Sequence, residues 1–313
     1  MSASPAAWAA SRTWRYDGDC DAAVSRVLAH RGSASISVVV PALDEERTVE
    51  GVVAPLVALR RKGLVDEVVL VDGGSRDRTA ELARDVGADV LHLGDLLPLD
   101  PHPGKGGALW ASLAATSGDV LVYLDADVAP FDPGWVPALL EPLLTTPQVQ
   151  LVKGCYERPV GAPGEPQSGR GGRVTELMAK PLLSLFWPEL AEVRQPLAGE
   201  TAARRSLLES VPFATGYGVE IGLLLDTWER FGLTGVAQVD LGERWHAPQS
   251  DDALARMSAT VLHAAMRRRI GPGGCRPVAT SLVQHARGPG GGLEAERHDV
   301  AGVDLPAHRG RAC

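Results

Sequence analysis

Short apolar runs typical of β-strands alternate with amphipathic helical segments through the first half of this 313-residue chain. The runs have about five residues and are separated by about twenty, as are strands joined by crossover helices. Four strands are expected, at Ser35–Val40, Glu67–Val71, Val90–Leu93 and Asp119–Leu124. Helices are expected between them, from Thr48 onward, over Asp77–Val86 and over Leu109–Ala115. The alternation predicts an α/β fold in which a mostly parallel sheet carries a nucleotide-binding half near the N-terminus.

The second half of the chain alternates less regularly. We expect two further strands and four further helices, the strands at Gln150–Gly154 and Gly235–Leu241 and the helices at Leu177–Trp187, Glu200–Leu208, Glu220–Phe231 and Ala253–Arg269. The segment Pro159–Arg173 contains five glycines and three prolines, which predicts an irregular, mobile loop. The Gly/Pro-rich tail after Gly288 is expected to be disordered.

The composition is that of a globular protein, with 45% hydrophobic and 22% charged residues. No apolar run approaches the length of about 20 residues that spans a bilayer, and the N-terminus lacks a basic region followed by an apolar one. We therefore expect a cytoplasmic protein without a membrane partner. The net charge of -8 gives no basic surface for a nucleic-acid backbone, so no nucleic-acid partner is expected. The four cysteines stand far apart, which argues against a zinc cage or a disulfide framework.

Asp125 and Asp127 follow the fourth expected strand directly, in the order Asp-Ala-Asp. Ligands of open α/β sheets bind at the carboxyl ends of the strands, so both carboxylates are expected at the binding edge. Carboxylate oxygens suit a divalent cation, and such a cation would hold a diphosphate. The motif alone is weak, because an acidic pair at the end of a strand also forms solvated turns and helix caps.

Two polar turns follow the first and second expected strands. The first reads Pro41-Ala42-Leu43-Asp44-Glu45-Glu46 and the second reads Asp72-Gly73-Gly74-Ser75-Arg76-Asp77. Small residues in such turns let the backbone approach a nucleotide closely. Each acidic residue, taken singly, is better explained by helix capping, with Ser75 or Asp77 as an N-cap. Together with the aspartate pair, the two turns converge on one edge of the sheet and predict a nucleotide site.

Three further segments carry groups that bind anions or metals. Lys105 stands among glycines at the start of the third helix, where exposed N–H groups, the helix dipole and the ammonium would together bind phosphate; a solvated loop lysine is the alternative. Gly172, Arg173 and Thr175 close the glycine-rich loop and suit a second anion, although Gly-Gly-Arg is also an ordinary helix entry. His246 follows an expected strand and would serve a metal only if the fold brought it near the aspartate pair; otherwise it is a packed or exposed histidine.

The two turns, together with Gln195-Pro196-Leu197-Ala198-Gly199-Glu200 and the segment from Phe213 to Leu224, resemble the glucosyl-3-phosphoglycerate synthases, which are retaining GT-A glycosyltransferases. The resemblance is most specific in Gly-Gly-Arg-Val-Thr-Glu-Leu and Gly-Tyr-Gly-Val-Glu-Ile-Gly. It implies a GT-A fold over residues 34–249, with a nucleotide-sugar-binding half at 34–128 and an acceptor half at 129–249. A helical arm (1–33), a C-terminal helical segment (250–287) and the tail (288–313) would flank this domain.

The resemblance also implies the substrates and the residues that bind them. UDP-glucose would be the donor, and the residues that bind it would be Pro41, Ala42, Leu43, Asp44, Glu45, Asp72, Gly73, Lys105, Asp125 and Ala126. Asp127 and His246 would hold Mg²⁺ or Mn²⁺ against the diphosphate.

The acceptor implied by the resemblance is 3-phosphoglycerate, which would receive glucose on its 2-hydroxyl. Gly172, Arg173 and Thr175 would bind this acceptor. Glu220 would lie near the transferred sugar and act with Lys105 in catalysis. The family resemblance further implies a homodimer.

Three departures from the family bear on these assignments. Asp44 stands where asparagine is usual, and Gly73 stands where serine is commoner. After His246 the chain reads Ala247-Pro248-Gln249, whereas the family often has an arginine and an asparagine that helps to hold the acceptor. Another small acceptor, such as a specialised metabolite, and GDP-glucose as donor are therefore alternatives. A non-catalytic sugar-nucleotide-binding protein is a third, and a nucleotidyltransferase a fourth, although the first turn lacks the glycine-rich basic signature of that class.

Overall fold

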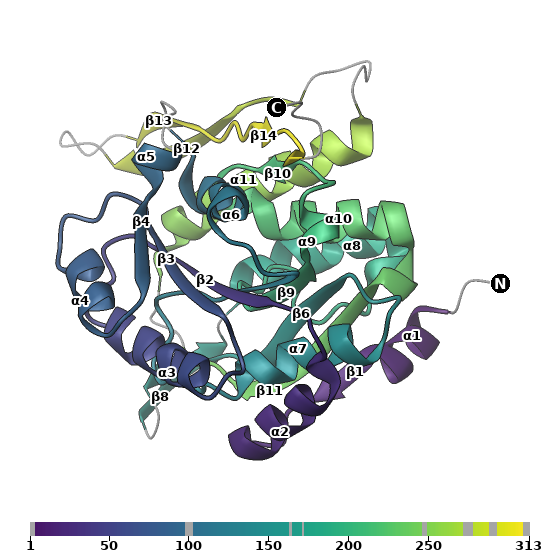
Figure 1. Ribbon diagram of the computed structural model, residues 1–313. Helices are drawn as coiled ribbons and strands as arrows, with labels where there is room; N and C mark the ends of the chain where they lie inside the picture. Colours follow the sequence, from purple (N-terminus) through teal and green to yellow (C-terminus); the bar gives the residue numbers. More distant parts are fainter. Residues whose placement is uncertain are drawn as a thin grey trace.

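The computed structural model describes residues 4–97, 103–162, 165–170, 172–245, 249–271, 278–287 and 293–308. These residues form a central sheet of eight strands, in the order β1-β11-β6-β9-β5-β2-β3-β4 (Figure 1). Helices cover both faces of the sheet, and a cluster of buried apolar side chains lies on each face. The predicted α/β fold is confirmed.

One strand of the central sheet runs against the other seven. The strands are β1 (Thr13–Arg15), β2 (Ile36–Ala42), β3 (Glu67–Asp72), β4 (Asp89–His92), β5 (Val120–Tyr123), β6 (Leu151–Glu157), β9 (Thr201–Arg204) and β11 (Val236–Glu243). β9 is antiparallel to both of its neighbours, β5 and β6, and the other pairs are parallel. The carboxyl ends of β2, β3, β5 and β11 therefore meet at one edge, and the predicted turns and the aspartate pair follow three of them.

The helices form two layers. One face of the sheet is covered by α2 (Cys20–Arg31), α3 (Val49–Arg61), α4 (Thr79–Asp85) and α7 (Trp135–Thr145). The other carries α6 (Gly104–Ala115), α8 (Lys180–Phe186), α10 (Val219–Phe231) and α11 (Asp251–Ile270). Val38 and Val40 of β2 pack in the first cluster and Val39 in the second, because successive side chains of a strand point to opposite faces. Burial on both faces is the reason why these strands read as continuous apolar runs.

Most predicted elements are confirmed with shifted bounds. β2 continues through Pro41, which lies opposite Val71 of β3. The predicted helix at Leu177–Trp187 forms as a π-helical turn, η1 (Thr175–Ala179), followed by α8. Neither α5 (Leu93–Leu96) nor α7 is predicted. The remaining short elements are α1 (Pro5–Arg12), η2 (Pro188–Leu190), α9 (Arg205–Leu208), η3 (Gly216–Gly218) and η4 (Leu233–Gly235).

The prediction of a helix at Glu200–Leu208 is wrong in its first half. β9 occupies that half, and only α9 is helical. Alanine and leucine favour helices, but Ala202 and Ala203 are fully buried in the sheet, where β5 and β6 bond the backbone of β9 from both sides. Two ladders of hydrogen bonds outweigh propensity differences of at most about 0.7 kcal/mol per residue.

Two segments expected to lack regular structure contain strands. β7 (Pro159–Ala162) and β8 (Glu165–Arg170) form an antiparallel pair within the expected loop. β12 (Ser281–Arg287) pairs with β13 (Leu293–Asp299), and β14 (Asp304–Leu305) pairs with β10 (Phe213–Ala214). The prediction of a disordered tail is therefore wrong for residues 293–299 and 304–305. The prediction of a helical segment over 250–287 is wrong at 281–287, which form β12. Composition is a poor guide here because ladders use backbone groups, which every sequence carries.

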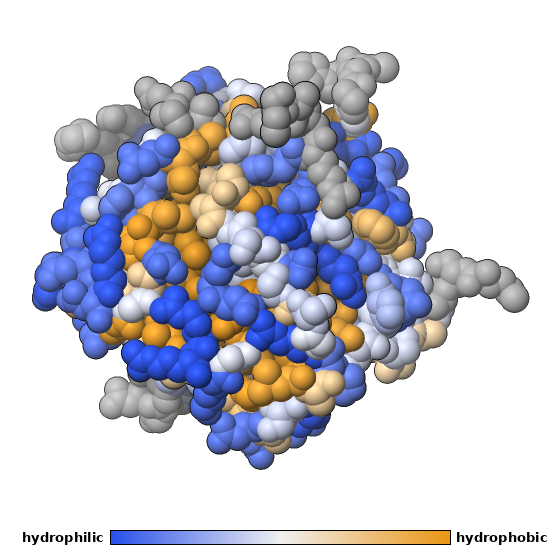
Figure 2. All heavy atoms as spheres, viewed as in Figure 1, coloured by the Kyte–Doolittle hydropathy of each residue, from blue (hydrophilic) through white to orange (hydrophobic). Residues whose placement is uncertain are grey.

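None of the described helices is both long and apolar enough to cross a bilayer. On the face seen in Figure 2, hydrophilic residues surround hydrophobic ones, which form separate patches.

Candidate active site

The turns after β2 and β3 are joined to each other by hydrogen bonds. The N–H groups of Asp44 and Glu45 donate to the hydroxyl oxygens of Ser75 (2.9 Å) and Thr79 (2.8 Å). The Asp44 carboxylate accepts from the N–H of Arg76 (2.7 Å). Asp44 has a φ of 56°, a conformation in which aspartate and asparagine are enriched among non-glycine residues. The aspartate therefore keeps the backbone geometry that the family's usual asparagine would also allow.

Asp72 is a buried carboxylate at the end of β3. It accepts a hydrogen bond from the N–H of Ser75 (3.1 Å), and its other oxygen lies 3.0 Å from Nδ1 of His92. Burial raises the pKa of Asp72, but these hydrogen bonds outweigh burial and hold the pKa below its ordinary value. The next residue, Gly73, donates its N–H to the carbonyl of Ala42 (2.8 Å), and a Cβ added to Gly73 would lie 3.3 Å from that oxygen. The turn is thus tight, and its buried carboxylate is ionised near neutral pH.

Lys105 links two parts of the site that are distant in sequence. Its Nζ lies 2.5 Å from Oδ1 of Asp125, which follows β5, and 2.6 Å from Oε1 of Glu220, in the first turn of α10. Burial lowers the pKa of Lys105, but the two carboxylates outweigh it and raise the pKa above its ordinary value. Burial raises the pKa of Asp125, but Lys105 and Arg244 outweigh it and lower that pKa strongly. Lys105 and Asp125 are therefore both charged near neutral pH.

Glycines bring the first turn of α6 against the segment that precedes α10. Gly104 has a φ of 58°, and a Cβ added to it would lie 3.2 Å from Cα of Gly216. A Cβ added to Gly106 would overlap with the carbonyl oxygen of Ala214. The N–H of Gly216 donates to the carbonyl of Pro103 (2.9 Å). The glycine-rich sequence that predicts a phosphate site thus also allows close packing of two elements.

Arg244, after β11, is a central residue of the site that the sequence motifs do not identify. It is 5% exposed, and its guanidinium lies 3.2 Å from Oδ2 of Asp125 and 2.7 Å from Oδ1 of Asp127. It also lies 2.9 Å from Oε1 of Glu200, which is fully buried. The Tyr156 hydroxyl donates to the other oxygen of Glu200 (2.6 Å) and accepts from Arg244 (3.1 Å). One buried guanidinium therefore contacts three carboxylates.

The two aspartates of the motif differ in environment. The Asp127 side chain is 53% exposed, against 20% for Asp125. Burial of its inner part and the neighbouring Asp125 raise the pKa of Asp127, and Arg244 opposes them. Asp127 is thus the carboxylate of the pair that solvent, or an ion from solvent, reaches more readily.

Gly199, just before β9, and Lys153 of β6 position the chain beside Asp125. A Cβ added to Gly199 would overlap with the Asp125 carboxylate, so glycine is required for this approach. Lys153 of β6 is buried and donates from Nζ to the carbonyl of Ala198 (2.6 Å) and to the hydroxyl of Thr201 (3.0 Å). Burial lowers the pKa of Lys153 to about 8. The lysine therefore fixes the chain on both sides of Gly199.

The described residues offer few metal ligands. No group of three or more His, Cys, Asp or Glu side chains that could hold an ion occurs among them. Asp127 presents a carboxylate at the edge of the sheet, and His246 lies outside the described residues. A cation held by one or two protein groups takes its other ligands from substrate phosphates and water, as Mg²⁺ usually does. The donor set fits a cation that binds together with a nucleoside diphosphate.

The predicted acceptor segment lies beside the start of α11. Arg173 pairs with Asp251 and donates from Nη2 to the carbonyl of Gln249 (2.6 Å). Arg173 is exposed, whereas Thr175, at the start of η1, is buried. Among the described residues, neither of them forms a hydrogen bond or ion pair with Lys105.

Arg158 connects the acceptor segment to the aspartate pair. A Cβ added to Gly172 would lie 2.9 Å from Cδ of Arg158, and Nη2 of Arg158 donates to the Tyr156 hydroxyl (3.0 Å). That hydroxyl also contacts Arg244, which holds both aspartates. Arg158 thus lies between the segment that begins at Gly172 and the buried network, at the same edge of the sheet.

The chain matches the family model described as Glycosyl transferase family 2 over residues 37–209, which is more than half of its length. It is 50% identical over 246 residues to a glucosyl-3-phosphoglycerate synthase of Mycolicibacterium smegmatis, a match that covers 78% of this chain and 81% of that relative. The chain belongs to the glucosyl-3-phosphoglycerate synthase family.

Solved structures of a glucosyl-3-phosphoglycerate synthase agree with the fold. The crystal structure of the Mycobacterium tuberculosis protein with Mn²⁺, uridine-diphosphate-glucose and phosphoglyceric acid has a TM-score of 0.80 at 44% identity, covering 91% of this chain and 94% of that one. The structure of the same protein with Mg²⁺ and uridine diphosphate has a TM-score of 0.83 at 43% identity, covering 95% and 98%. The resemblance to this family and the GT-A fold, both inferred from motifs, are confirmed.

Proposed function

We propose that the protein is a hexosyltransferase that moves glucose from UDP-glucose to the 2-hydroxyl of 3-phosphoglycerate, with Mg²⁺ or Mn²⁺ as cofactor. Membership of the glucosyl-3-phosphoglycerate synthase family, at 50% identity to one relative, is the observation that carries the proposal. The crystallised M. tuberculosis relative holds Mn²⁺, uridine-diphosphate-glucose and phosphoglyceric acid together.

The donor would bind at the edge formed by the turns after β2 and β3. The backbone from Pro41 to Glu45, with Asp72 and Gly73, would contact the uridine, and the ionised Asp72 supplies an acceptor for a ring N–H. The exposed Leu43 would cover one side of the base. Asp125 and Ala126 would contact the ribose.

Lys105 would act on the leaving group. As the anomeric bond breaks, negative charge grows on the departing diphosphate, and a charged ammonium at the start of α6 binds that charge more strongly in the transition state than in the ground state. Asp127 and His246 would hold the cation, which when bound would offset the charge of the diphosphate. Arg244 would hold each aspartate in place, Asp125 for the ribose and Asp127 for the cation.

Glu220 would orient groups around the transferred sugar and would not attack it. Its Oε1 is 2.6 Å from Nζ of Lys105, and a carboxylate held by an ammonium at this distance is a weak nucleophile. We therefore favour attack by the acceptor hydroxyl on the face that the diphosphate leaves. The departing phosphate oxygen takes the hydroxyl proton as the anomeric bond breaks, and configuration is retained. NMR of the product distinguishes the outcomes, because retention yields an α-glucoside from the α-configured donor, and a β-glucoside would contradict it.

One assay tests the proposed function. Purified protein is incubated with UDP-glucose and 3-phosphoglycerate, with Mg²⁺ or with EDTA, and UDP release is followed. We expect release that requires both substrates and the cation, and that is lost in Asp127→Ala but kept in Asp21→Ala, a change at an exposed surface ion pair. Metal-independent turnover, or unchanged turnover in Asp127→Ala, would contradict the metal assignment.

The residues after His246 give a specific reason to test other substrates, because they lack the family's usual asparagine. A panel of small hydroxy acids, sugars and alcohols with radiolabelled UDP-glucose or GDP-glucose identifies the pair that is used. Product with another acceptor and none with 3-phosphoglycerate would favour a related transferase. Release of pyrophosphate in place of UDP would indicate a nucleotidyltransferase, and absence of turnover with every pair would favour a sugar-nucleotide-binding protein.

The family resemblance also leads us to propose a homodimer. Size-exclusion chromatography with light scattering measures the mass directly. A mass equal to that of one chain at micromolar concentration would contradict this part of the proposal.

A further inference from the structure

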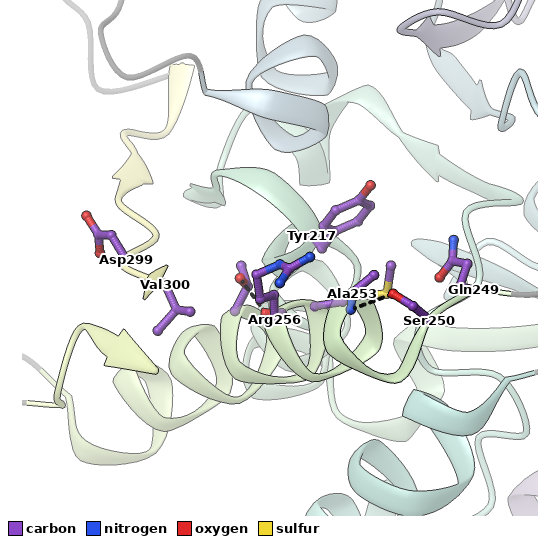
Figure 3. A pocket seen from close by; sticks show the side chains of 9 residues that line it. Tyr217, Gln249, Ser250, Ala253, Arg256, Asp299 and Val300 are labelled. Atoms are coloured by element: carbon purple, nitrogen blue, oxygen red, sulfur yellow. Dashed lines mark hydrogen bonds between the residues drawn. The ribbon is translucent and has the colours of Figure 1, made fainter. Parts of the chain in front are cut away.

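A pocket lies between α11 and η3, next to the site described above. Its volume is about 390 Å³, within the range of about 300–1,000 Å³ typical of small-molecule sites. Tyr217 and Arg256 line it, with Gln249 and Ser250 toward one end and Asp299 at the other (Figure 3). We call it the α11 pocket.

The α11 pocket adjoins the two parts of the candidate site that act on the sugar and the acceptor. Tyr217 stands three residues before Glu220, in the segment that packs on the first turn of α6. At the other side, Arg173 donates to the carbonyl of Gln249, which lines the pocket. The pocket therefore extends from the acceptor segment toward the pair formed by Lys105 and Glu220.

Arg256 places a guanidinium in the wall of the pocket and forms no ion pair with a described residue. Its Nη1 donates to the side-chain oxygen of Gln284 (3.3 Å), whose amide nitrogen donates to Asp252 (3.3 Å). Asp299 lies at the far end of the pocket and accepts from the N–H of Ala301 (2.8 Å). A guanidinium in a concave wall, bonded to a neutral amide, suits a carboxylate or a phosphate.

We propose that the α11 pocket receives one of the two anionic groups of the acceptor and that Arg256 binds it, while Arg173 binds the other. The inference rests on the proposed function, in which the acceptor carries a carboxylate and a phosphate. The chain lacks the arginine and asparagine that its family often has after the metal histidine, and it reads Ala247-Pro248-Gln249 there. Arg256, in α11 and seven residues after Gln249, supplies a cation in the wall of the pocket.

The test compares Arg256→Met and Arg256→Lys with Arg269→Met, an exposed arginine of the same helix that does not line the pocket. The KM for 3-phosphoglycerate is measured at saturating UDP-glucose, and the KM for UDP-glucose at saturating acceptor. We expect Arg256→Met to raise the acceptor KM about 10- to 100-fold, the effect of one charge-assisted hydrogen bond, with the donor KM within about twofold of wild type. Arg256→Lys keeps the charge, so its acceptor KM is expected to lie between those of the wild type and Arg256→Met.

Two truncated acceptors identify the group that Arg256 binds. Glycerate lacks the phosphate, and glycerol 3-phosphate lacks the carboxylate. For the acceptor that lacks the group bound by Arg256, the KM of Arg256→Met is expected to equal that of the wild type. An acceptor KM unchanged in Arg256→Met, or raised equally in Arg269→Met, would overturn the inference while the proposed function stood. Absence of wild-type turnover with 3-phosphoglycerate would overturn the proposed function, and the inference with it.

Discussion

The side chain of Lys105 is held between two carboxylates, and this pairing fixes both its charge and its position. We expect Lys105→Met to lower kcat about 100- to 1,000-fold, the usual cost of removing one preorganised group that stabilises developing charge. The loss is expected in kcat more than in the KM for UDP-glucose, because the leaving group gains charge mainly in the transition state. Steady-state UDP release measures both constants.

Lys62→Met is the matched control for this prediction. Lys62 pairs with Asp21 on the surface, and both side chains are more than half exposed. The kcat of Lys62→Met is expected to equal that of the wild type. If Lys105→Met kept wild-type kcat while its thermal unfolding was also unchanged, the role of Lys105 at the leaving group would be refuted.

Lys153 makes the stability of the protein depend on pH in a defined direction. Burial lowers its pKa in the folded state to about 8, from 10.5. Between these values the unfolded chain binds more protons at this residue than the folded chain, so its contribution to the free energy of unfolding rises with pH. The rise is about 3 kcal/mol across the whole window.

Urea unfolding of wild type and Lys153→Met at pH 8 and pH 10 isolates this contribution, since the other titrating groups cancel in the difference. The stability of the wild type relative to the variant is expected to increase between the two pH values. A difference that stays constant would mean that Lys153 titrates normally in the folded protein.

Individual site residues differ in how well the sequence identifies them. Lys105 stands among glycines at a helix start and Asp125 closes an apolar strand, so both have a local signature. Arg244 has none: it is a single arginine after a strand, and its partners Asp125 and Asp127 are 119 and 117 residues away. Its role depends on the order of strands in the sheet, which hydrophobic periodicity does not specify.

At the scale of elements, α6 and the segment before α10 are held together by a glycine contact. A Cβ at position 106 would overlap with the carbonyl of Ala214, so Gly106→Ala must push the two elements apart. We expect a loss of about 1–3 kcal/mol in the free energy of unfolding, typical of overpacking, and a loss of activity because Lys105 moves with the helix. Chemical denaturation and UDP release measure the two effects.

Gly51→Ala is the matched control within another helix. Gly51 lies in α3 with no atom within 4 Å of an added Cβ. Alanine there is expected to stabilise the protein by up to about 1 kcal/mol, through helix propensity, with activity unchanged. If both substitutions behaved alike, close packing at Gly106 would not be the cause.

Elements are predictable where one kind of local signal decides their structure. The strands β2, β3 and β5 are buried on both faces, and their apolar runs mark them clearly. β9 is missed because its alanines favour a helix while its position between β5 and β6 is decided by distant segments. The pair β10 and β14 is missed for the same reason, since Phe213 and Leu305 are far apart in sequence.

At the scale of the whole molecule, the direction of the strands assembles the candidate site. Seven of the eight strands of the central sheet are parallel, so the segments after β2, β3, β5 and β11 reach the same edge. The buried network there contains Asp125, Glu200 and Glu220 against Lys105 and Arg244. Asp127 is the most exposed carboxylate of this group, so it is the one that a bare diphosphate at the edge would meet and be repelled by.

The exposed charge of Asp127 predicts how ligands stabilise the whole protein. UDP alone is expected to bind weakly, because its diphosphate meets Asp127, and a divalent cation alone is expected to bind weakly, because the described residues offer it few ligands. Together, the phosphates of UDP supply ligands to Mg²⁺, and Mg²⁺ separates the diphosphate charge from Asp127. When the concentration of the UDP–Mg²⁺ complex is about 100-fold above its dissociation constant, binding should stabilise the fold by about 2.7 kcal/mol, a rise of about 4 °C in Tm.

Thermal melts of wild type, Asp127→Asn and Asp21→Asn with UDP, with Mg²⁺, with both, and with both plus EDTA measure the effect. The combined shift is expected to exceed the sum of the single shifts in the wild type and in Asp21→Asn, and to be lost in Asp127→Asn and on addition of EDTA. Asparagine keeps the shape of the side chain and removes the charge that a cation needs, so loss of synergy in this variant would trace the coupling to that carboxylate. An equal shift by UDP with and without EDTA would show that the donor nucleotide binds without a cation.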